Sequence, residues 1–300
     1  MKMCGIVGLF LKDKTLQQKL GQLLSQMLVT MRDRGPDSAG IALYGNSIAT
    51  ETKITIRSDE HVEEFPSLLS TVKRTISKDI RLRQKDTHAV LSIGSKKVDK
   101  MLTCLSRDFP KIRVMSIGSS IEIYKEVGLP ETITRRFSID KMTGTHGVGH
   151  TRMATESAVT TLGAHPFSTG LDQCLVHNGS LSNHNSIRRN LLHEGFRFET
   201  ENDSEVAAAY LTNRMQKGAT LGEALQDSLS QLDGFFTFVV GTKEGFGILR
   251  DPIACKPAVM AETERYVAFG SEYRALTALP GIDTAHIWEP EPATVYFWAT

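Results

Sequence analysis

Cysteine is scarce in this sequence, and its scarcity excludes two kinds of structural scaffold. Only four cysteines occur among the 300 residues, and they form neither a CxxC pair nor a Cys/His cluster with zinc spacing. We therefore expect no disulfide framework and no metal site. A chain without structural disulfides suits a reducing compartment, so a cytoplasmic location is predicted.

Charge of one sign and long hydrophobic runs are also missing. The 35 lysines and arginines nearly balance the 34 aspartates and glutamates, which gives the chain no overall attraction to nucleic acid or anionic lipid. No apolar run approaches the roughly 18 residues of a membrane span. The apolar segment Cys4–Leu11 is followed at once by charged residues 12–14, which indicates a buried strand rather than a signal peptide. We expect neither nucleic acid nor a membrane as partner.

What is present is an ordinary globular composition, with 40% hydrophobic and 23% charged residues. Leucine and methionine recur every three or four positions from Leu16 to Met31, which predicts a helix of about five turns with one face on a core. The Gly35-Pro36 pair ends this helix, because proline cannot continue it. A short strand is expected over residues 41–44.

Residues 50–145 have a different character and are predicted to form an inserted α/β segment. Apolar runs at 89–93 and 112–117 flank a helical pattern at 98–109, a strand–helix–strand order that indicates a small βαβ-like insert. Residues 73–85 carry six basic side chains against one acidic. Because no aromatic residues alternate with them, we interpret them as a solvated helix face or a partner-docking surface.

The remainder of the chain predicts helices that cover antiparallel sheets, an α+β fold. One helix is expected from Asp203, and a second follows Thr220, whose partner Glu223 completes a capping-box pattern. A short helix is expected near residues 273–279. The runs expected to be strands are 235–240, 246–249, 257–260, 266–269 and 294–298.

Five short motifs are the candidates for chemistry. They are Cys4–Gly8 (CGIVG), Arg34–Gly40 (RGPDSAG), Gly149–Thr155 (GHTRMAT), His177–Gly179 (HNG) and Asn202–Glu205 (NDSE). Together, in this order, they resemble the class II glutamine amidotransferases, whose glutaminase domain is an N-terminal-nucleophile hydrolase. The resemblance covers residues 4–45 and 146 to about 280. It implies a four-layer αββα sandwich and a discontinuous type-2 glutamine amidotransferase domain over residues 4–300.

Cys4 is the candidate nucleophile. A cysteine in an apolar strand is also compatible with a purely structural role. The resemblance implies instead that its own α-amine, with an ordinary pKa of about 7.7–8.0, is the base for a thiol that is largely protonated at neutral pH. This mechanism requires removal of residues 1–3. Translation from Met3, cleavage of a short propeptide, and a blocked, inert cysteine all remain open.

The other motifs acquire roles from the same resemblance. Asn178-Gly179 is also typical of a hairpin turn, but the resemblance makes it the oxyanion hole for attack on a carboxamide. Arg152 then clamps the α-carboxylate of glutamine with its bidentate guanidinium. Asp203, which is also typical of a helix N-cap, then faces the α-ammonium.

Two further groups of residues are assigned by the resemblance. Thr155 and the loop to His165 match the segment that closes over bound glutamine, so both residues are predicted to bind substrate. Arg34, Gly35 and Asp37 of RGPDSAG are expected to support the nucleophile strand without taking part in catalysis.

The motif GHTRMATES narrows the resemblance within the family. Met153 and Glu156 stand where sugar-phosphate amidotransferases of this class carry Trp and His. The pattern and the preceding insert are closer to the glutaminase-type subunits of glutamate-synthase-like complexes, such as the A subunit of N-methylglutamate synthase (methylamine–glutamate N-methyltransferase). This implies that glutamine or glutamate is the small-molecule ligand and that ammonia passes to synthase subunits of a hetero-oligomer. No cofactor is expected in this chain; FMN and an iron–sulfur cluster are expected on those partner subunits.

Two other functions stay open at this point. The first is a stand-alone N-terminal-nucleophile amidase acting on another amide, against which Arg152 and Asp203 argue because together they select a free amino acid. The second is a non-catalytic assembly or regulatory subunit that retains an amino-acid pocket. A mature chain that keeps Met-Lys-Met before Cys4 favours this second alternative.

Overall fold

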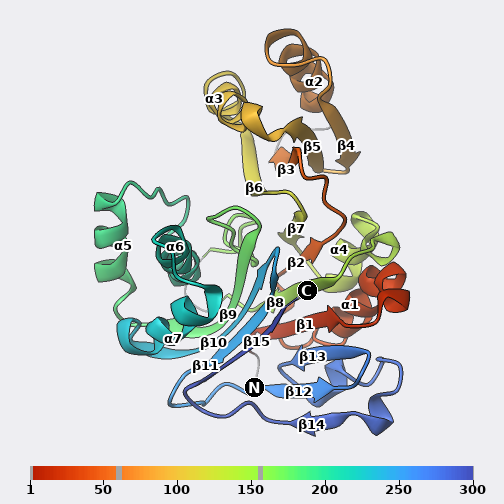
Figure 1. Cartoon of the computed structure of the whole chain (residues 1–300), viewed down its shortest axis with the longest axis vertical. Coiled ribbons are helices and arrows are strands. Elements are labelled where there is room, and N and C mark those ends of the chain that lie inside the picture. Colours follow the sequence, from red (N-terminus) through yellow and green to blue (C-terminus); the bar gives the residue numbers. More distant parts are fainter. Residues whose placement is uncertain (1–2, 59–62, 155–157, 300) are drawn as a thin grey trace.

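A computed structural model describes residues 3–58, 63–154 and 158–299, and its centre is a seven-stranded antiparallel sheet (Figure 1). The strands lie in the order β14-β12-β13-β1-β8-β2-β7, so β1, which follows Cys4, is internal to the sheet. All seven residues of β1 are buried, as expected for the opening apolar strand. The bounds are β1 Gly5–Leu11, β2 Ser38–Tyr44, β7 Ile121–Val127, β8 His146–Arg152, β12 Val259–Glu262, β13 Tyr266–Gly270 and β14 His286–Trp288.

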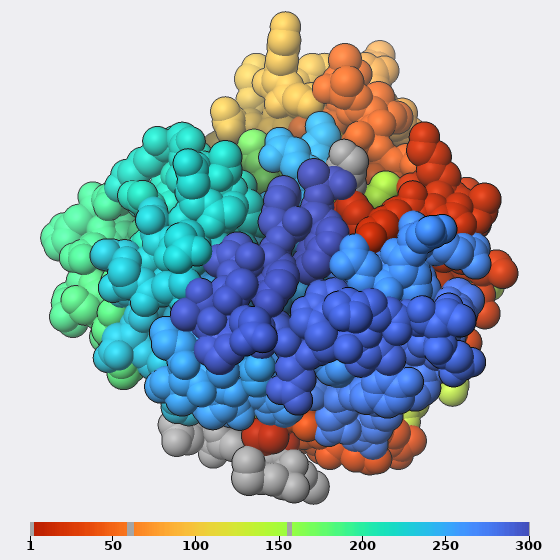
Figure 2. Space-filling view, turned by 60° about the horizontal axis from the view of Figure 1, so that its bottom comes forward, coloured from red at the N-terminus to blue at the C-terminus, as the bar shows by residue number. Residues whose placement is uncertain are grey.

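A second, four-stranded sheet packs face to face against the first. Its order is β15-β11-β10-β9, with the bounds β9 Gln173–Leu181, β10 Gly234–Thr242, β11 Gly245–Arg250 and β15 Thr294–Ala299. Fully buried apolar side chains of both sheets form one cluster between them, including Ile6 and Val148 from the first sheet and Val176, Val239 and Phe246 from the second. The face of the molecule with β15 at its centre is shown in Figure 2.

Helices cover the two outer faces of the paired sheets. The 3₁₀ helix η1 (Lys14–Lys19), α1 (Leu20–Val29) and α4 (Pro130–Arg136) lie on the seven-stranded side, whereas α5 (His184–His193), α6 (Asp203–Gln216) and α7 (Leu221–Gln231) lie on the other (Figure 1). The α+β prediction is therefore confirmed. The helix expected over residues 16–31 exists, but its first part is the 3₁₀ helix η1 and the α-helix begins only at Leu20.

Several local predictions of the C-terminal half are confirmed. Thr220 and Glu223 form the expected capping box at the start of α7. The five expected strands correspond to β10, β11, β12, β13 and β15, and the short helix near residue 273 is the 3₁₀ turn η4, Tyr273–Ala275. Among the described residues, no helix is long and apolar enough to cross a membrane.

Residues 51–118 form a third sheet with two helices, here called the inserted module. Its element order is βαββαβ and its strand order is β4-β5-β3-β6, which is the ferredoxin-like split βαβ arrangement. The expected βαβ order is present in β5–α3–β6, but these two parallel strands are not neighbours, because β3 lies between them antiparallel to both. The bounds are β3 Glu51–Ser58, α2 Glu64–Thr75, β4 Arg81–Lys85, β5 His88–Gly94, α3 Val98–Asp108 and β6 Ile112–Gly118.

The module protrudes from one end of the molecule (Figures 1 and 2). Helices α2 and α3 cover one face of its sheet with their own apolar core, and β3 on the other face contacts β7 of the main sheet. The rest of the expected insert, residues 121–145, packs with the main sheet through β7 and α4. The division of the chain at residues 50 and 145 stays a prediction.

The basic segment 73–85 does not form one solvated helix face. Helix α2 ends at Thr75, and the second half of the segment is strand β4. Cationic side chains of β4 contact residues outside the inserted module. Arg83 pairs with Glu122 of β7 at 2.6 Å, and Lys85 donates to the Phe137 carbonyl at 2.8 Å. Only the first half of the segment, with Lys73, Arg74 and Lys78, remains exposed without such contacts among the described residues.

Candidate active site

Three of the other four motifs meet at Cys4, the first residue of the CGIVG motif. This residue precedes β1, and its thiol lies 3.8 Å from the carbonyl oxygen of Met153, just beyond β8. Its own carbonyl oxygen accepts hydrogen bonds from Arg34 Nε at 3.0 Å and from Asn178 Nδ2 at 3.2 Å. Segments more than a hundred residues apart in sequence thus converge on one residue, because β8 pairs with β1 and the second sheet packs beneath both.

The Cys4 thiol lies in a surrounding that disfavours the thiolate. Burial raises its pKa, and a hydrogen bond with the Met153 backbone and the charges of Arg152 and Lys256 only partly oppose that rise. A thiol in this state needs a base before it can act as a nucleophile.

Asn178 and Gly179 lie inside strand β9, not in a hairpin turn. They pair with Thr237 and Phe236 of β10, and Asn178 is almost fully buried beneath Cys4. Gly179 has a φ of +153°, and a Cβ there would lie 2.0 Å from the carbonyl oxygen of Phe235. The alternative of a plain Asn-Gly turn is therefore wrong, and the position of the glycine is one that an L side chain would not tolerate.

Arg152 and Asp203 lie at the ends of elements that border the same site. Arg152 ends β8, is buried, and its Nη1 donates to the Ala158 carbonyl at 3.4 Å. Asp203 is the first residue of α6, and its Oδ2 accepts from the Leu181 backbone N–H at 2.9 Å. The N-cap of α6 is Asn202, so the N-cap interpretation of Asp203 is wrong and its carboxylate is held against β9 instead.

Three buried histidines lie behind this site. His150 of β8 stacks on His165 at 4.1 Å and its Nε2 lies 3.1 Å from the His177 carbonyl oxygen, while His177 Nδ1 lies 2.8 Å from Ser204 Oγ. Burial lowers the pKa of each, that of His150 to about 3, so all three are neutral at physiological pH. Sequence reasoning selected only His165 and missed His150 and His177, although both lie within motifs it had singled out.

The RGPDSAG turn contacts both Cys4 and the segment that follows β8. Arg34 contacts the Cys4 carbonyl and also pairs with Glu272. Asp37 accepts the Ala154 N–H at 2.8 Å, and the Gly35 backbone is so close to the Arg152 backbone that a Cβ would lie 2.6 Å from it.

Lys256 is a further residue at this site that the sequence reasoning missed. Its ammonium lies 5.0 Å from the centre of the Phe235 ring, and its charge acts on both Cys4 and His177. The loop that carries it is fixed by Asp251, which caps the Ile253 N–H at 2.9 Å. The signal in the sequence is the run RDPIACKP, residues 250–257, which turns sharply between two strands.

Thr155, with Glu156, lies outside the described residues, so its placement at the substrate stays a prediction. Within the described ranges, no group of three or more His, Cys, Asp or Glu side chains is arranged to hold a metal ion.

The chain belongs to the class II glutamine amidotransferases. Residues 150–278 match the family model of a glutamine amidotransferase domain. Over 99% of this chain and 98% of the relative, the sequence is 63% identical to the glutamine amidotransferase-like protein GlxB of Rhizobium meliloti. It is also 34% identical, over 98% of both chains, to a putative glutamine amidotransferase of Methanothermobacter thermautotrophicus.

A solved structure shares the fold. The glutamine phosphoribosylpyrophosphate amidotransferase of B. subtilis superimposes with a TM-score of 0.62 at 18% identity, over 98% of this chain and 47% of that one. At this identity the likeness defines the α+β architecture and says nothing of the acceptor substrate.

Proposed function

We propose that this protein is the glutaminase subunit of a glutamate-synthase-like complex of the N-methylglutamate synthase type. It hydrolyses the side-chain amide of glutamine and passes the ammonia to a synthase partner. The observation that carries the proposal is the convergence of Asn178 and Arg34 on the backbone of Cys4, beside Arg152. No cofactor is required for this half-reaction, since the thiol supplies the nucleophile.

The proposed chemistry proceeds through a thioester. A free α-amine on Cys4 takes the thiol proton, and the sulfur attacks the amide carbon of glutamine. Asn178 Nδ2 and the Gly179 N–H stabilise the oxyanion, which collapses with cleavage of the C–N bond and departure of ammonia that carries the transferred proton. Water, activated by the same amine, then attacks the thioester and releases glutamate. Because burial raises the pKa of the Cys4 thiol, the amine is an essential part of this mechanism.

Recognition of a free amino acid is proposed for the two charged residues at the rim. The guanidinium of Arg152 suits the α-carboxylate and the carboxylate of Asp203 suits the α-ammonium. Thr155 and His165 are proposed to bind the substrate. This pair of opposite charges disfavours the alternative of an amidase for other amides.

The nitrogen acceptor is proposed to lie on synthase subunits that carry FMN and an iron–sulfur cluster, in a cytoplasmic hetero-oligomer. The support is the sequence resemblance to glutaminase-type subunits, together with the inserted module, which offers a surface outside the catalytic layers. Its exposed cations Lys73, Arg74 and Lys78 are the proposed docking face, because clustered charge steers association.

One experiment separates this proposal from a non-catalytic subunit. The intact mass of the purified protein and its glutaminase rate are measured on the same preparation, with Cys4→Ala as the control. We expect a chain that begins at Cys4, an active wild type and an inactive variant. A chain that retains residues 1–3 and shows no glutaminase activity favours the assembly role, and activity from such a chain overturns the amine-base mechanism.

A further inference from the structure

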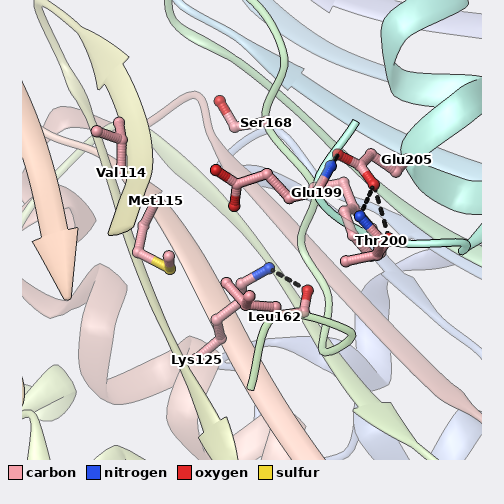
Figure 3. Close-up of a pocket in the computed structure, with 9 residues that line it drawn as sticks. Val114, Met115, Lys125, Leu162, Ser168, Glu199, Thr200 and Glu205 are labelled. Carbon is pink, nitrogen blue, oxygen red and sulfur yellow. Dashed lines mark hydrogen bonds between the residues drawn. The ribbon is translucent and has the colours of Figure 1, made fainter. Parts of the chain in front are cut away.

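Strand β7 holds the loop 158–167 through a buried lysine. Lys125 Nζ donates hydrogen bonds to three carbonyl oxygens of this loop, those of Leu162 at 3.2 Å, Ala164 at 2.7 Å and Pro166 at 3.2 Å. Its ammonium also lies 4.7 Å from the centre of the Phe167 ring. Figure 3 shows Lys125 reaching toward the Leu162 segment. Ammonium bonds to several carbonyls fix the path of residues 162–166, which lead into the backbone bridge between Phe167 and Leu175.

The next residue of the same strand holds the loop at a second point. The carboxylate of Glu126 accepts a hydrogen bond from Thr161 Oγ1, and its exposed fraction is only 7%. The same carboxylate accepts from Arg57 of β3, with Nη2 at 3.3 Å from both oxygens. Glu126 therefore contacts both the loop 158–167 and the inserted module.

The neighbouring ion pair across the same two strands lacks this second contact. Lys53 lies four residues before Arg57 on β3, and its ammonium is 3.2 Å from Glu122, four residues before Glu126 on β7. Both pairs are largely buried and both join the module to the main sheet. Glu122 accepts in addition from Arg83 and Tyr124, neither of which belongs to the loop.

The loop itself is part of the site. The Ala158 carbonyl accepts from Arg152, and His165 stacks on His150 behind Cys4. Its other side borders a cavity of about 40 Å³ lined by Lys125, Leu162 and Phe167. A change in the contacts between β7 and this loop therefore changes the positions of the groups around the proposed glutamine site.

We propose that Lys125 and Glu126 are positioning residues for the loop over the glutamine site, and that Glu126 couples this position to the inserted module through Arg57. The proposal rests on the proposed glutaminase function. A ligand or subunit that shifts the module relative to β7 changes the geometry of Thr161, and with it the closure of the loop on glutamine.

The test compares Arg57→Met with Lys53→Met in the full-length chain, with Arg57→Lys as the conservative variant. Two readouts are taken: kcat and KM for glutamine, and hydrogen–deuterium exchange of the loop amides. We expect Arg57→Met to raise KM about tenfold, toward the lower end of the range for coupled sites, and to speed exchange in the loop. Lys53→Met is expected to leave both within about twofold, at similar melting temperature, and Arg57→Lys to recover part of the effect.

The double variant Arg57→Met/Thr161→Val completes the test. If Glu126 links the two residues, the double variant is no worse than the Thr161→Val single variant. Equal effects of Arg57→Met and Lys53→Met on loop exchange would overturn the coupling. A wild type with no glutaminase activity would overturn the proposed function instead, and the exchange comparison would still decide whether the module and the loop are linked.

Discussion

The side-chain amide of Asn178 points at the backbone of Cys4. It donates to the Cys4 carbonyl oxygen at 3.2 Å. Its position depends on burial in β9 and not on a turn, so the fold itself holds this donor in place. Such a fixed donor acts on the charge that develops in the transition state more than on the bound substrate.

We expect Asn178→Ala to lower kcat for glutamine hydrolysis by about 10²–10³ and to leave KM close to the wild-type value. The matched control is Asn213→Ala, another buried asparagine, which lies in α6 and donates to Glu194 at the end of α5. Steady-state kinetics of the two variants provide the measurement. A change in KM alone would assign Asn178 to substrate binding rather than to the oxyanion.

The motifs made the residue-scale prediction possible because each is contiguous in sequence. Cys4, Arg34 and Asn178 could be selected in this way, and the structure brings them together. Lys125 and Lys256 could not, since a single lysine in a strand or loop carries no signal of its partners. Their roles depend on tertiary contacts with segments that are distant in the chain.

At the scale of the element, strand β9 depends on one glycine. Gly179 has a positive φ, and a Cβ on it would lie 2.0 Å from the carbonyl oxygen of Phe235. Gly218 has a φ of +98°, but a Cβ on it would meet open space. The two positions therefore separate backbone strain from steric overlap.

We expect Gly218→Ala to lower the free energy of unfolding by about 1–2 kcal/mol, the usual magnitude for a non-glycine residue at positive φ. Gly179→Ala adds the overlap with β10, so its loss should exceed that of Gly218→Ala by at least about 2 kcal/mol and should abolish glutaminase activity. Urea denaturation of both variants measures the difference. Equal destabilisation would mean that β9 and β10 separate easily at this point.

Strand β3 is an element that sequence reasoning missed, and its polar face is buried. Strand β3 alternates apolar residues with Lys53, Thr55 and Arg57, and it was not expected as a strand. Its polar face packs against the carboxylates of β7, a pairing that no local pattern reveals. The apolar strands β5 and β6 were expected, because hydrophobic runs report burial without knowledge of the partner.

On the scale of the whole molecule, buried neutral histidines make the free energy of unfolding depend on pH. Burial lowers the pKa of His88 and His150 to about 3 and that of His146 to about 4. Above a pH of about 6.5, where unfolded histidine is neutral as well, their titration does not affect the folding equilibrium. Below it, the unfolded chain binds protons that the folded chain does not.

We therefore expect the free energy of unfolding to fall steadily as pH drops from about 6.5 to about 4. Denaturant titrations at several pH values measure the slope. His146→Gln should flatten it, because one buried imidazole no longer titrates on unfolding, and His286→Gln should not, since His286 is exposed. A slope equal in wild type and His146→Gln would show that carboxylates dominate the acid response.

The assembled protein is expected to be faster than the isolated chain. We expect a synthase partner to raise kcat/KM for glutamine at least about tenfold, because closure of the loop is coupled to the module. Reversal of the exposed charges at Lys73, Arg74 and Lys78 should weaken complex formation on gel filtration, and reversal of Lys14, on η1 of the core, should not. Equal activity with and without partner would contradict the coupling.

The entry and exit of the inserted module have an evolutionary consequence. Tyr44 and Ile121 lie opposite each other in the β2–β7 pair, and the Gly45 N–H donates to the Ser120 carbonyl at 3.1 Å. Residues 45–120 thus occupy the place of a hairpin turn, which a dipeptide such as Asn-Gly could fill. A single genetic insertion at that turn would add the module without altering the strand order of the seven-stranded sheet. A chain without the module would still contain Cys4, Arg34 and Asn178 and the strands that bring them together.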